Sequence, residues 1–376
     1  MKTIFKLILV FLTIITISCN KEDVTENLNS TTQNRPGDPP PPVELGYSDI
    51  TSTYINDGIS TTCAKNILIF PSWARYTQVM DYLDNQTETY CNAFDATVPV
   101  GTSDDAYDAL ALAATPIPFD EDNKLKEFEN SLQFCSLRLK LNTLENNWLA
   151  IQGDGIWNPN TDPDNHFIDE DTERAMLNEG VEVIIGTRLN GIIYKFTEDG
   201  GYYTIANMDY AALQQINSGI IPVGNTNVVK VEPPKPNSNT SICKGDVSYR
   251  NYFSTGSDTK IKTVDKIKNR PTSTFMTETR IKAKTKYYRK KLGVWSKGKT
   301  TITAKIEGLL NVGFVYQGCG PEYSISVTKT KRRNKVKAKQ TYWDTEIFHL
   351  QNKVFATHKR REDVIKIIDF NNGIVQ

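Results

Sequence analysis

The chain has 376 residues, and its 44 basic and 44 acidic side chains give no formal net charge. A hydrophobic content of 39% and an aromatic content of 10% suffice for two ordinary domains with apolar cores. The chain is therefore neither too small nor too polar to fold. The charge is divided unevenly: residues 20–241 hold 13 basic and 33 acidic side chains, a net charge of −20, whereas residues 242–376 hold 29 and 11, a net charge of +18.

The first 18 residues have the pattern of a signal peptide. Lys2 and Lys6 precede the apolar run Leu7–Ile17, which is too short for a stable membrane span. Ser18-Cys19 resembles a bacterial lipobox, and the acidic stretch after Cys19 (NKED) resembles the surface-export signal of Bacteroidota lipoproteins. The resemblance implies a lipid anchor at Cys19, in the outer membrane and facing the cell surface. A plain signal peptide with an incidental cysteine is the alternative.

Proline-rich segments divide the rest of the chain. Residues 19–46 contain a run of four prolines and predict an extended tether, and residues 231–241 contain three prolines and predict a linker. The sequence therefore predicts an acidic domain over residues 47–230 and a basic domain over residues 242–376.

Apolar residues recur at helical spacing through much of the acidic domain. After a short buried strand at 66–70, Ser72 is placed to cap a helix whose stripe includes Trp73, Val79 and Leu83. Further helices are predicted over residues 104–114, 121–150, 169–178 and 208–217. Cys135 lies on the apolar stripe of the long helix, which favours a packed thiol.

Three short β-rich runs, at residues 181–186, 192–196 and 202–205, predict a small antiparallel meander. Residues 165–205 resemble a module of uncharacterised Bacteroidota secreted proteins, which carries no known chemistry. The predicted fold class is α+β, with a mainly helical N-terminal domain that contains the meander and an all-β C-terminal domain, sandwich or barrel-like.

The loop at residues 153–171 is rich in oxygen-bearing side chains that nearly alternate. Ca²⁺ binds 6 to 8 oxygen ligands, so a calcium site is one interpretation of this loop. Asn and Asp next to Pro also build turns through their own hydrogen bonds, and this second interpretation explains every residue without a cation. The candidate ligands are Asp154, Asn158, Asn160, Asp162 and Asp164.

The basic domain alternates with the period of a β-strand. Along residues 279–287 the charged side chains Arg280, Lys282, Lys284 and Lys286 share one face, and residues 300–306, 323–328 and 335–339 continue the alternation. A basic run that includes Lys331, Arg332 and Arg333 is predicted at a turn. Together these seven residues form a basic stripe that could bind an external polyanion. Alternatively, the two oppositely charged halves attract each other, and the stripe is buried inside the molecule.

Six cysteines are present, and none lies in a Cys-x-x-Cys pair, which argues against a structural zinc site and a thioredoxin-like centre. Cys243 and Cys319 are alone in the basic domain. We therefore predict a disulfide between them in the oxidising compartment that the leader implies.

No catalytic motif is present: we find no G-x-S-x-G, no H-E-x-x-H and no phosphate-binding or dinucleotide-binding glycine loop. The sequence favours a lipid-anchored binding or structural module, with acidic polysaccharide or lipopolysaccharide as the ligand class and no support for nucleic acid. One alternative is an accessory subunit docked on an envelope protein complex. Another is a secreted hydrolase, which a pocket of converging carboxylates or histidines would favour.

Overall fold

The first half of the chain is built on a six-stranded sheet in the order β1-β2-β3-β4-β5-β6. The computed structural model describes residues 47–54, 66–232, 245–273, 276–312, 321–344, 348–349 and 353–375. The predicted signal peptide, Cys19 and the tether lie outside these ranges. The strands are β1 (Thr51–Tyr54), β2 (Asn66–Phe70), β3 (Glu182–Ile185), β4 (Ile192–Phe196), β5 (Tyr202–Ile205) and β6 (Val228–Val231).

The prediction of a mainly helical N-terminal domain is wrong. The predicted meander, β3 to β5, is joined to β2 by a parallel pairing of Ile69 with Ile184, and β1 and β6 extend the sheet at its two edges. A parallel pairing between segments more than 100 residues apart leaves no local sequence signal. The helices are α2 (Trp73–Thr97), α3 (Asp104–Ala113), α4 (Asn123–Ser131), α5 (Leu137–Ala150), α6 (Asp171–Met176) and α7 (Tyr210–Asn217).

Local capping explains several of these boundaries. Ser72 caps α2 as predicted, since its side chain accepts a hydrogen bond from the backbone of Arg75. The single helix predicted over residues 121–150 is divided into α4 and α5. Gln133 takes a left-handed conformation, with φ of 49°, and Ser136 then caps α5. Among the described residues, no helix combines the length and the apolar content that crossing a membrane would require.

The second half of the described chain forms two stacked sheets. The first has the order β10-β9-β8-β7, with β13 also paired to β9, and the second has the order β12-β11-β15-β16-β17, with β14 paired to β11. The strands are β7 (Val247–Gly256), β8 (Thr259–Ser273), β9 (Met276–Lys291), β10 (Val294–Lys297), β11 (Thr300–Val312), β12 (Glu322–Arg333), β13 (Lys335–Asp344), β14 (Phe348–His349), β15 (Val354–Arg360), β16 (Asp363–Asp369) and β17 (Gly373–Ile374).

The facing sides of the two sheets enclose an apolar core. Ile281 and Ala283 from β9 meet Ile302, Ala304 and Ile306 from β11, and all five are buried. Their spacing of two residues is the alternation that the sequence predicts. Two further cores lie on the two faces of the six-stranded sheet, one toward α2 and α4 and one toward α7.

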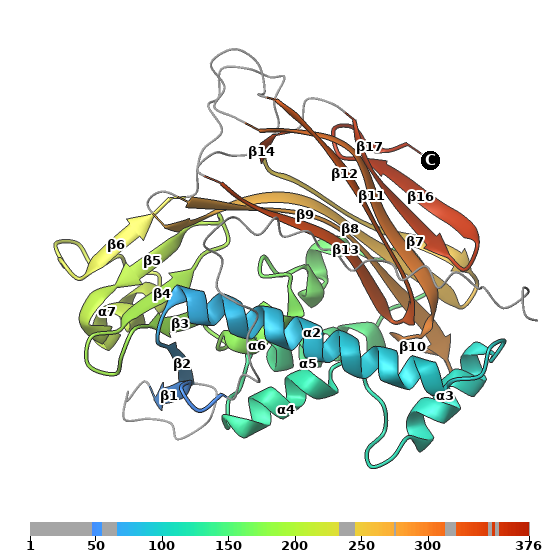
Figure 1. Cartoon of the computed structure of the whole chain (residues 1–376), viewed down its shortest axis with the longest axis horizontal. Coiled ribbons are helices and arrows are strands. Elements are labelled where there is room, and N and C mark those ends of the chain that lie inside the picture. The colour runs from blue at the N-terminus through green and yellow to red at the C-terminus, as the bar shows by residue number, and fades with distance from the viewer. Residues whose placement is uncertain are drawn as a thin grey trace, which may run out of the picture. The chain divides into compact units, whose positions relative to one another are not determined.

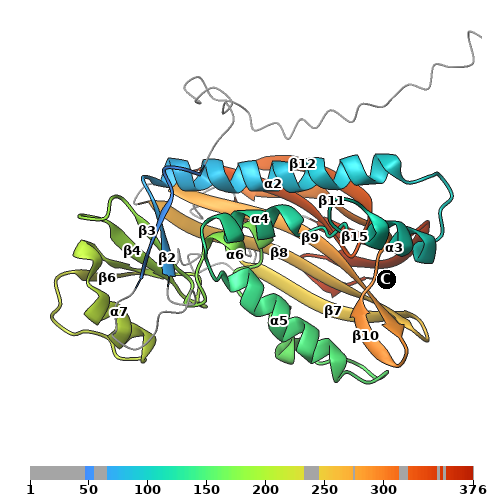
Figure 2. The same ribbon diagram turned by 90° about the horizontal axis from the view of Figure 1, so that it is seen from below.

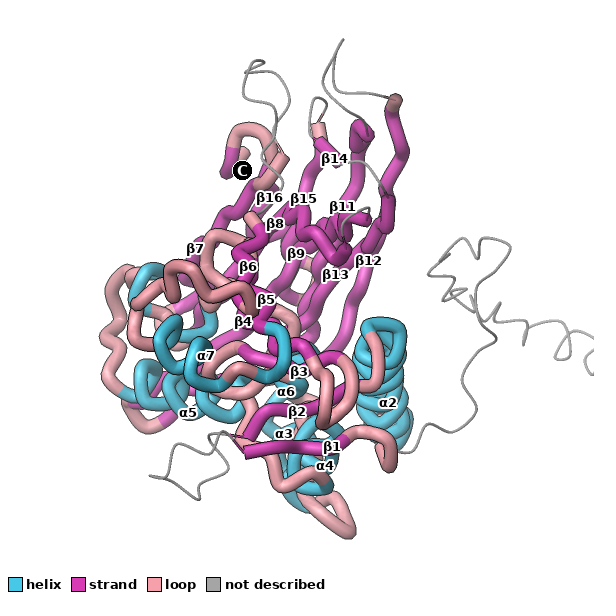
Figure 3. The backbone as a smooth tube through the Cα atoms, turned by 90° about the vertical axis from the view of Figure 1, so that its left-hand side faces the viewer, coloured by secondary structure: helices cyan, strands magenta, loops and turns pink. Residues whose placement is uncertain are grey.

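Helices cover the other face of the β7–β10 sheet. In Figure 1 the strands of the sandwich stand above α2, α4 and α5. In Figure 2, seen from below, α4 and α5 lie in front of the sandwich strands, and α2 runs along the side of β12. Figure 3 shows the strands of the sandwich in the upper part of the view and the helices, with β1 to β3 among them, in the lower part. Glu44–Gln376 forms one compact unit, so the acidic and basic segments pack against each other within it.

Candidate functional site

Four of the seven residues of the predicted basic stripe are on β9, and they lie between the two layers. Each of these four side chains pairs with a carboxylate of the acidic segment. We call these contacts, together with those of β8 and β13 described next, the ion layer. For each of the four residues, the shortest contact to the acidic segment is Arg280 to Glu173 at 2.9 Å, Lys282 to Asp169 at 2.7 Å, Lys284 to Asp164 at 3.2 Å and Lys286 to Glu145 at 2.6 Å.

The neighbouring strands continue the ion layer on both sides of β9. Lys262 on β8 lies 2.6 Å from Asp162 and 2.8 Å from Asp164. On β13, Lys337 lies 2.6 Å from Glu170. These lysines come into register because β8 and β13 both pair antiparallel with β9.

The basic run near residue 330 also pairs inward. It forms the end of β12 and not a turn, and its side chains contact α2 and the N-terminal end of α3. The contacts are Lys331 to Glu88 at 3.5 Å, Arg332 to Asp104 at 2.8 Å and Arg333 to Asp95 at 2.6 Å. The seven predicted polyanion-binding residues therefore pair inside the described molecule, and they do not form a free basic surface.

Asp164 is the centre of the ion layer. Its carboxylate is buried and lies within 3.2 Å of nitrogens on Arg174, Lys262, Lys284 and Lys286. Burial alone would raise the pKa of Asp164, but these positive charges hold the pKa well below its usual range. Burial lowers the pKa of Lys284 to about 7, with Asp164 opposing the shift and the neighbouring lysines adding to it.

The oxygen-rich loop supplies carboxylates to the ion layer. Asp162 and Asp164 receive the ammonium group of Lys262, while Asp154 receives that of Lys290 at 2.8 Å. Asn158 accepts a hydrogen bond from the backbone of Asn160, and so caps a short turn of helix at Pro159–Thr161. Among the described residues no group of three or more His, Cys, Asp or Glu side chains is placed to hold a metal ion. Lysine ammonium groups thus contact three of the five candidate calcium ligands, Asp154, Asp162 and Asp164.

Two of the six cysteines, Cys91 and Cys135, lie within the described residues. Cys135 is disulfide-bonded, so the prediction of a packed thiol at this position is wrong. Cys91 is a free, buried thiol, and burial raises its pKa to about 12. The predicted bridge between Cys243 and Cys319 lies outside the described residues.

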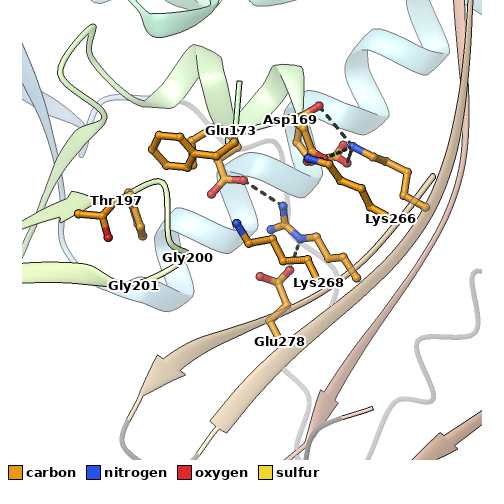
Figure 4. A pocket seen from close by; sticks show the side chains of 14 residues that line it. Asp169, Glu173, Thr197, Gly200, Gly201, Lys266, Lys268 and Glu278 are labelled. Carbon is orange, nitrogen blue, oxygen red and sulfur yellow. Dashed lines mark hydrogen bonds and ion pairs between the residues drawn. The ribbon is translucent and has the colours of Figure 1, made fainter. Parts of the chain in front are cut away.

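A small pocket opens at the edge of the ion layer, beside α6 and the turn between β4 and β5 (Figure 4). It encloses about 40 Å³ and is lined by four carboxylates, those of Asp169, Glu170, Glu173 and Glu278. Converging carboxylates are what a hydrolase would need, but a general acid needs a raised pKa. Burial would raise the pKa values of Asp169 and Glu170, yet the nearby lysines hold both well below their usual range. The space admits water molecules and no sugar ring, so this pocket does not favour the hydrolase.

A threonine, a histidine and an aspartate meet between the two sheets. The His358 ring lies 2.8 Å from the Thr285 hydroxyl and 3.0 Å from the Asp265 carboxylate. All three side chains are fully buried. No substrate can reach the threonine oxygen through the packed sheets, so we assign the group to the packing of the sandwich and not to catalysis.

A larger cleft lies at the edge of the sandwich, where the loop after α5 meets β7 and β16. Its volume is about 470 Å³, within the range of small-molecule sites. The half-buried Tyr252 and Phe253 contribute aromatic surface, and Ser254 and Thr255 contribute hydroxyl groups. Trp157 lies at the base of the cleft and is only 2% exposed. Behind Trp157, the side chains of Tyr288 and Trp295 complete a buried aromatic cluster. The cleft can therefore hold a ligand that has both an apolar face and hydrogen-bonding groups.

Sequence reasoning missed this cleft. Its residues come from three segments that are distant in the chain, and each segment is unremarkable by itself. The aromatic residues of the basic strands are placed elsewhere. Tyr288 and Trp295 lie behind the cleft, Tyr287 is in the sandwich core, and Trp343 is 40% exposed on β13. The available signal was the Trp157 side chain within a loop that is otherwise composed of turn residues.

Comparisons with known proteins give little further guidance. No model of a protein family matches the chain, and no curated protein matches it. One matching solved structure is a DUF4848 family protein from Bacteroides thetaiotaomicron, which is 14% identical; the match covers 83% of this chain and 95% of that chain, with a TM-score of 0.20. A TM-score this low carries no argument about fold or function.

Proposed function

We propose that the protein is a lipid-anchored binding module of the bacterial envelope, held in the outer membrane through Cys19 and facing the cell surface. We propose further that its ligand is a glycan, which binds in the cleft lined by Trp157, Tyr252 and Phe253. The observation that carries this proposal is the cleft itself, since it combines sufficient volume with aromatic walls and hydroxyl groups.

Sugar rings suit such a cleft because they have both apolar C–H faces and hydroxyl groups. Aromatic side chains bury a large apolar area against such a face, and serine and threonine hydroxyls both donate and accept hydrogen bonds. The basic stripe is a poorer candidate, because a glycan would first have to displace buried carboxylates such as Asp164 and Glu170 from their lysine partners.

The proposal is tested by screening the soluble chain from residue 20 to residue 376 against an array of bacterial and host glycans. Any glycan that binds is then titrated into Phe253→Ala and, as a control, into Tyr323→Ala. Tyr323 is an exposed aromatic residue on β12 that does not line the cleft. We expect Phe253→Ala to weaken binding about tenfold or more, equivalent to about 1.4 kcal/mol, and Tyr323→Ala to leave it unchanged.

Three outcomes would contradict the proposal. The first is that no glycan binds, and the second is that both variants bind as the unmodified chain does. The third is release of shortened products from the bound glycan, which would make the protein a hydrolase. The melting temperature of each variant shows whether a lost affinity reflects a lost fold.

A further inference from the structure

The cleft holds two ammonium groups, those of Lys260 and Lys366, that differ from the lysines of the ion layer in their partners. Lys366 lies over the ring of Phe253, with its nitrogen 4.9 Å from the ring centroid. Within the described ranges no acidic side chain forms an ion pair with Lys366. By contrast, the seven residues of the predicted basic stripe all meet carboxylates.

Lys260 is fixed in place by neutral groups. Its ammonium nitrogen donates to the backbone carbonyls of Asp154 and Gly155, at 2.8 and 2.7 Å, and it lies about 5 Å from the rings of Trp157 and Trp295. Carbonyl oxygens and ring faces orient a positive charge but do not neutralise it. The carboxylate of Asp154, which is mostly exposed, pairs with Lys290 instead. Lys260 is thus buried with its ammonium group already hydrogen-bonded, and the half-buried Lys366 is the lysine of the cleft that remains available to a ligand.

A ligand that matches both features carries an anionic group attached directly to a ring with an apolar face. A uronic acid unit has this form, since its carboxylate is one bond from the sugar ring. Its ring can pack along Ile156, which is 99% exposed, and Tyr252, while its carboxylate reaches the Lys366 ammonium as a charge-assisted hydrogen-bond acceptor. A neutral sugar of the same shape lacks this second contact.

We infer that the cleft selects acidic oligosaccharides and that Lys366 pairs with the carboxylate of a uronic acid unit. The inference rests on the proposed function, since it names the substrate class of the same cleft. Lys366 is then the residue that determines specificity, whereas Tyr252 and Phe253 supply contacts that neutral and acidic sugars share.

The test uses matched pairs of oligosaccharides in calorimetric titrations of the chain from residue 20 to residue 376. Tetragalacturonate and tetramannuronate are each compared with their carboxyl-reduced forms, which keep the ring and the length but lose the charge. We expect the acidic form of at least one pair to bind about tenfold more tightly, equivalent to about 1.4 kcal/mol. That preference should weaken as NaCl rises, because the contact is partly exposed to solvent.

Three variants assign the preference to one side chain. Lys366→Met should abolish the preference for the acidic form, and Lys366→Arg should retain it because the charge remains. Lys353→Met makes the same substitution at an exposed lysine that does not line the cleft, and should change nothing. The salt dependence of the unmodified chain serves as an independent measurement if Lys366→Met fails to fold.

The outcomes separate the inference from the proposed function. If each reduced oligosaccharide binds as tightly as its acidic form, the inference is overturned, while glycan binding in the cleft stands. If Lys366→Met keeps the preference, another residue recognises the carboxylate of the sugar, and the inference is again overturned. If neither these sugars nor any glycan of the array binds, the proposed function itself is overturned.

Discussion

The β7–β10 sheet is buried on both faces, by two different physical means. Its inner face packs apolar side chains such as Ile281 and Ala283 against the second sheet, whereas its outer face packs lysines against the carboxylates of the acidic segment. Both faces derive from the same alternation along β9. A strand can therefore be buried on both faces and still show the alternation of apolar and charged residues that is typical of a strand with one face in solvent.

The two faces contribute differently to the free energy of folding. Burial of apolar surface stabilises by about 25 cal/mol per Å² and tolerates exchange between similar side chains. A buried ion pair gains Coulomb energy but loses the hydration of both charges, so its net contribution is near zero or unfavourable. We therefore expect the inner face to supply stability, and the outer face to fix which surface of the acidic segment docks and in which register.

The largest effect is expected from removing one charge at the centre of the ion layer. Asp164→Asn leaves Lys262, Lys284 and Lys286 buried without their shared carboxylate, and should lower the free energy of unfolding by about 3–5 kcal/mol. Urea unfolding of the soluble chain, followed by tryptophan fluorescence, measures the loss.

Lys284→Met is the matched substitution on the basic side. Because burial lowers the pKa of Lys284 to about 7, its charge is partly lost at neutral pH, and methionine fills a similar space. This variant should stay within about 1 kcal/mol of the unmodified chain. A loss as large as that of Asp164→Asn would mean that stability depends on each individual ion pair. It would contradict the expectation that stability depends on the balance of charge around Asp164.

An intermediate effect is expected from Glu121, which lies at the margin of the ion layer and accepts a hydrogen bond from the backbone of Asn334. Burial raises its pKa from 4.5 to about 7, although Lys335 opposes the shift. Between pH 4.5 and 7 the folded protein binds this proton more strongly than the unfolded chain does. Glu121 therefore loses part of its stabilising effect as the pH rises through this window, by at most about 1.4 kcal/mol per pH unit.

Glu121→Gln keeps the acceptor oxygen and removes the titration. Its stability should match that of the unmodified chain near pH 4.5 and exceed it at pH 7.5, as measured by urea unfolding at a series of pH values. A constant difference between the two proteins across this range would show that Glu121 does not titrate there. Thr204→Val, at the half-buried position of β5, removes no titratable group and should leave the pH dependence of stability unchanged.

A small effect, similar in size to that of Lys284→Met, is expected on the inner face. Ile281→Val removes one methylene group from the core and should cost about 0.5–1.5 kcal/mol, without a change in pH dependence. The same urea titrations measure it. A loss comparable to that of Asp164→Asn would show that the apolar face is as sensitive to substitution as the charged face.

Local patterns in the sequence predicted elements better than they predicted partners. The alternation at residues 279–287 and the cap at Ser72 depend on neighbouring residues, and both occur in the structure as expected. The parallel pairing of β2 with β3 and the break at Gln133 depend on distant contacts and were missed. Lipidation at Cys19 and the bridge between Cys243 and Cys319 stay predictions.

The candidate site was harder to predict than the fold. Charge asymmetry correctly singled out Lys282, Lys284 and Lys286 as unusual, but composition cannot decide whether a basic strand faces solvent or a second layer of the same chain. The cleft was missed for a different reason. Phe253 and Lys366 show no unusual pattern in their own segments, and they form one site only because the fold brings β7 and β16 together.

The order in which the ion layer's partners are made has a consequence for folding. Glu145 precedes its partner Lys286 by 141 residues, and Glu170 precedes Lys337 by 167. Since the chain is made from its N-terminus, each carboxylate emerges before its counterpart does. During that interval the acidic segment is a strongly self-repelling polyanion, which opposes premature compaction. The basic strands, which follow later in the same chain, then neutralise this negative charge.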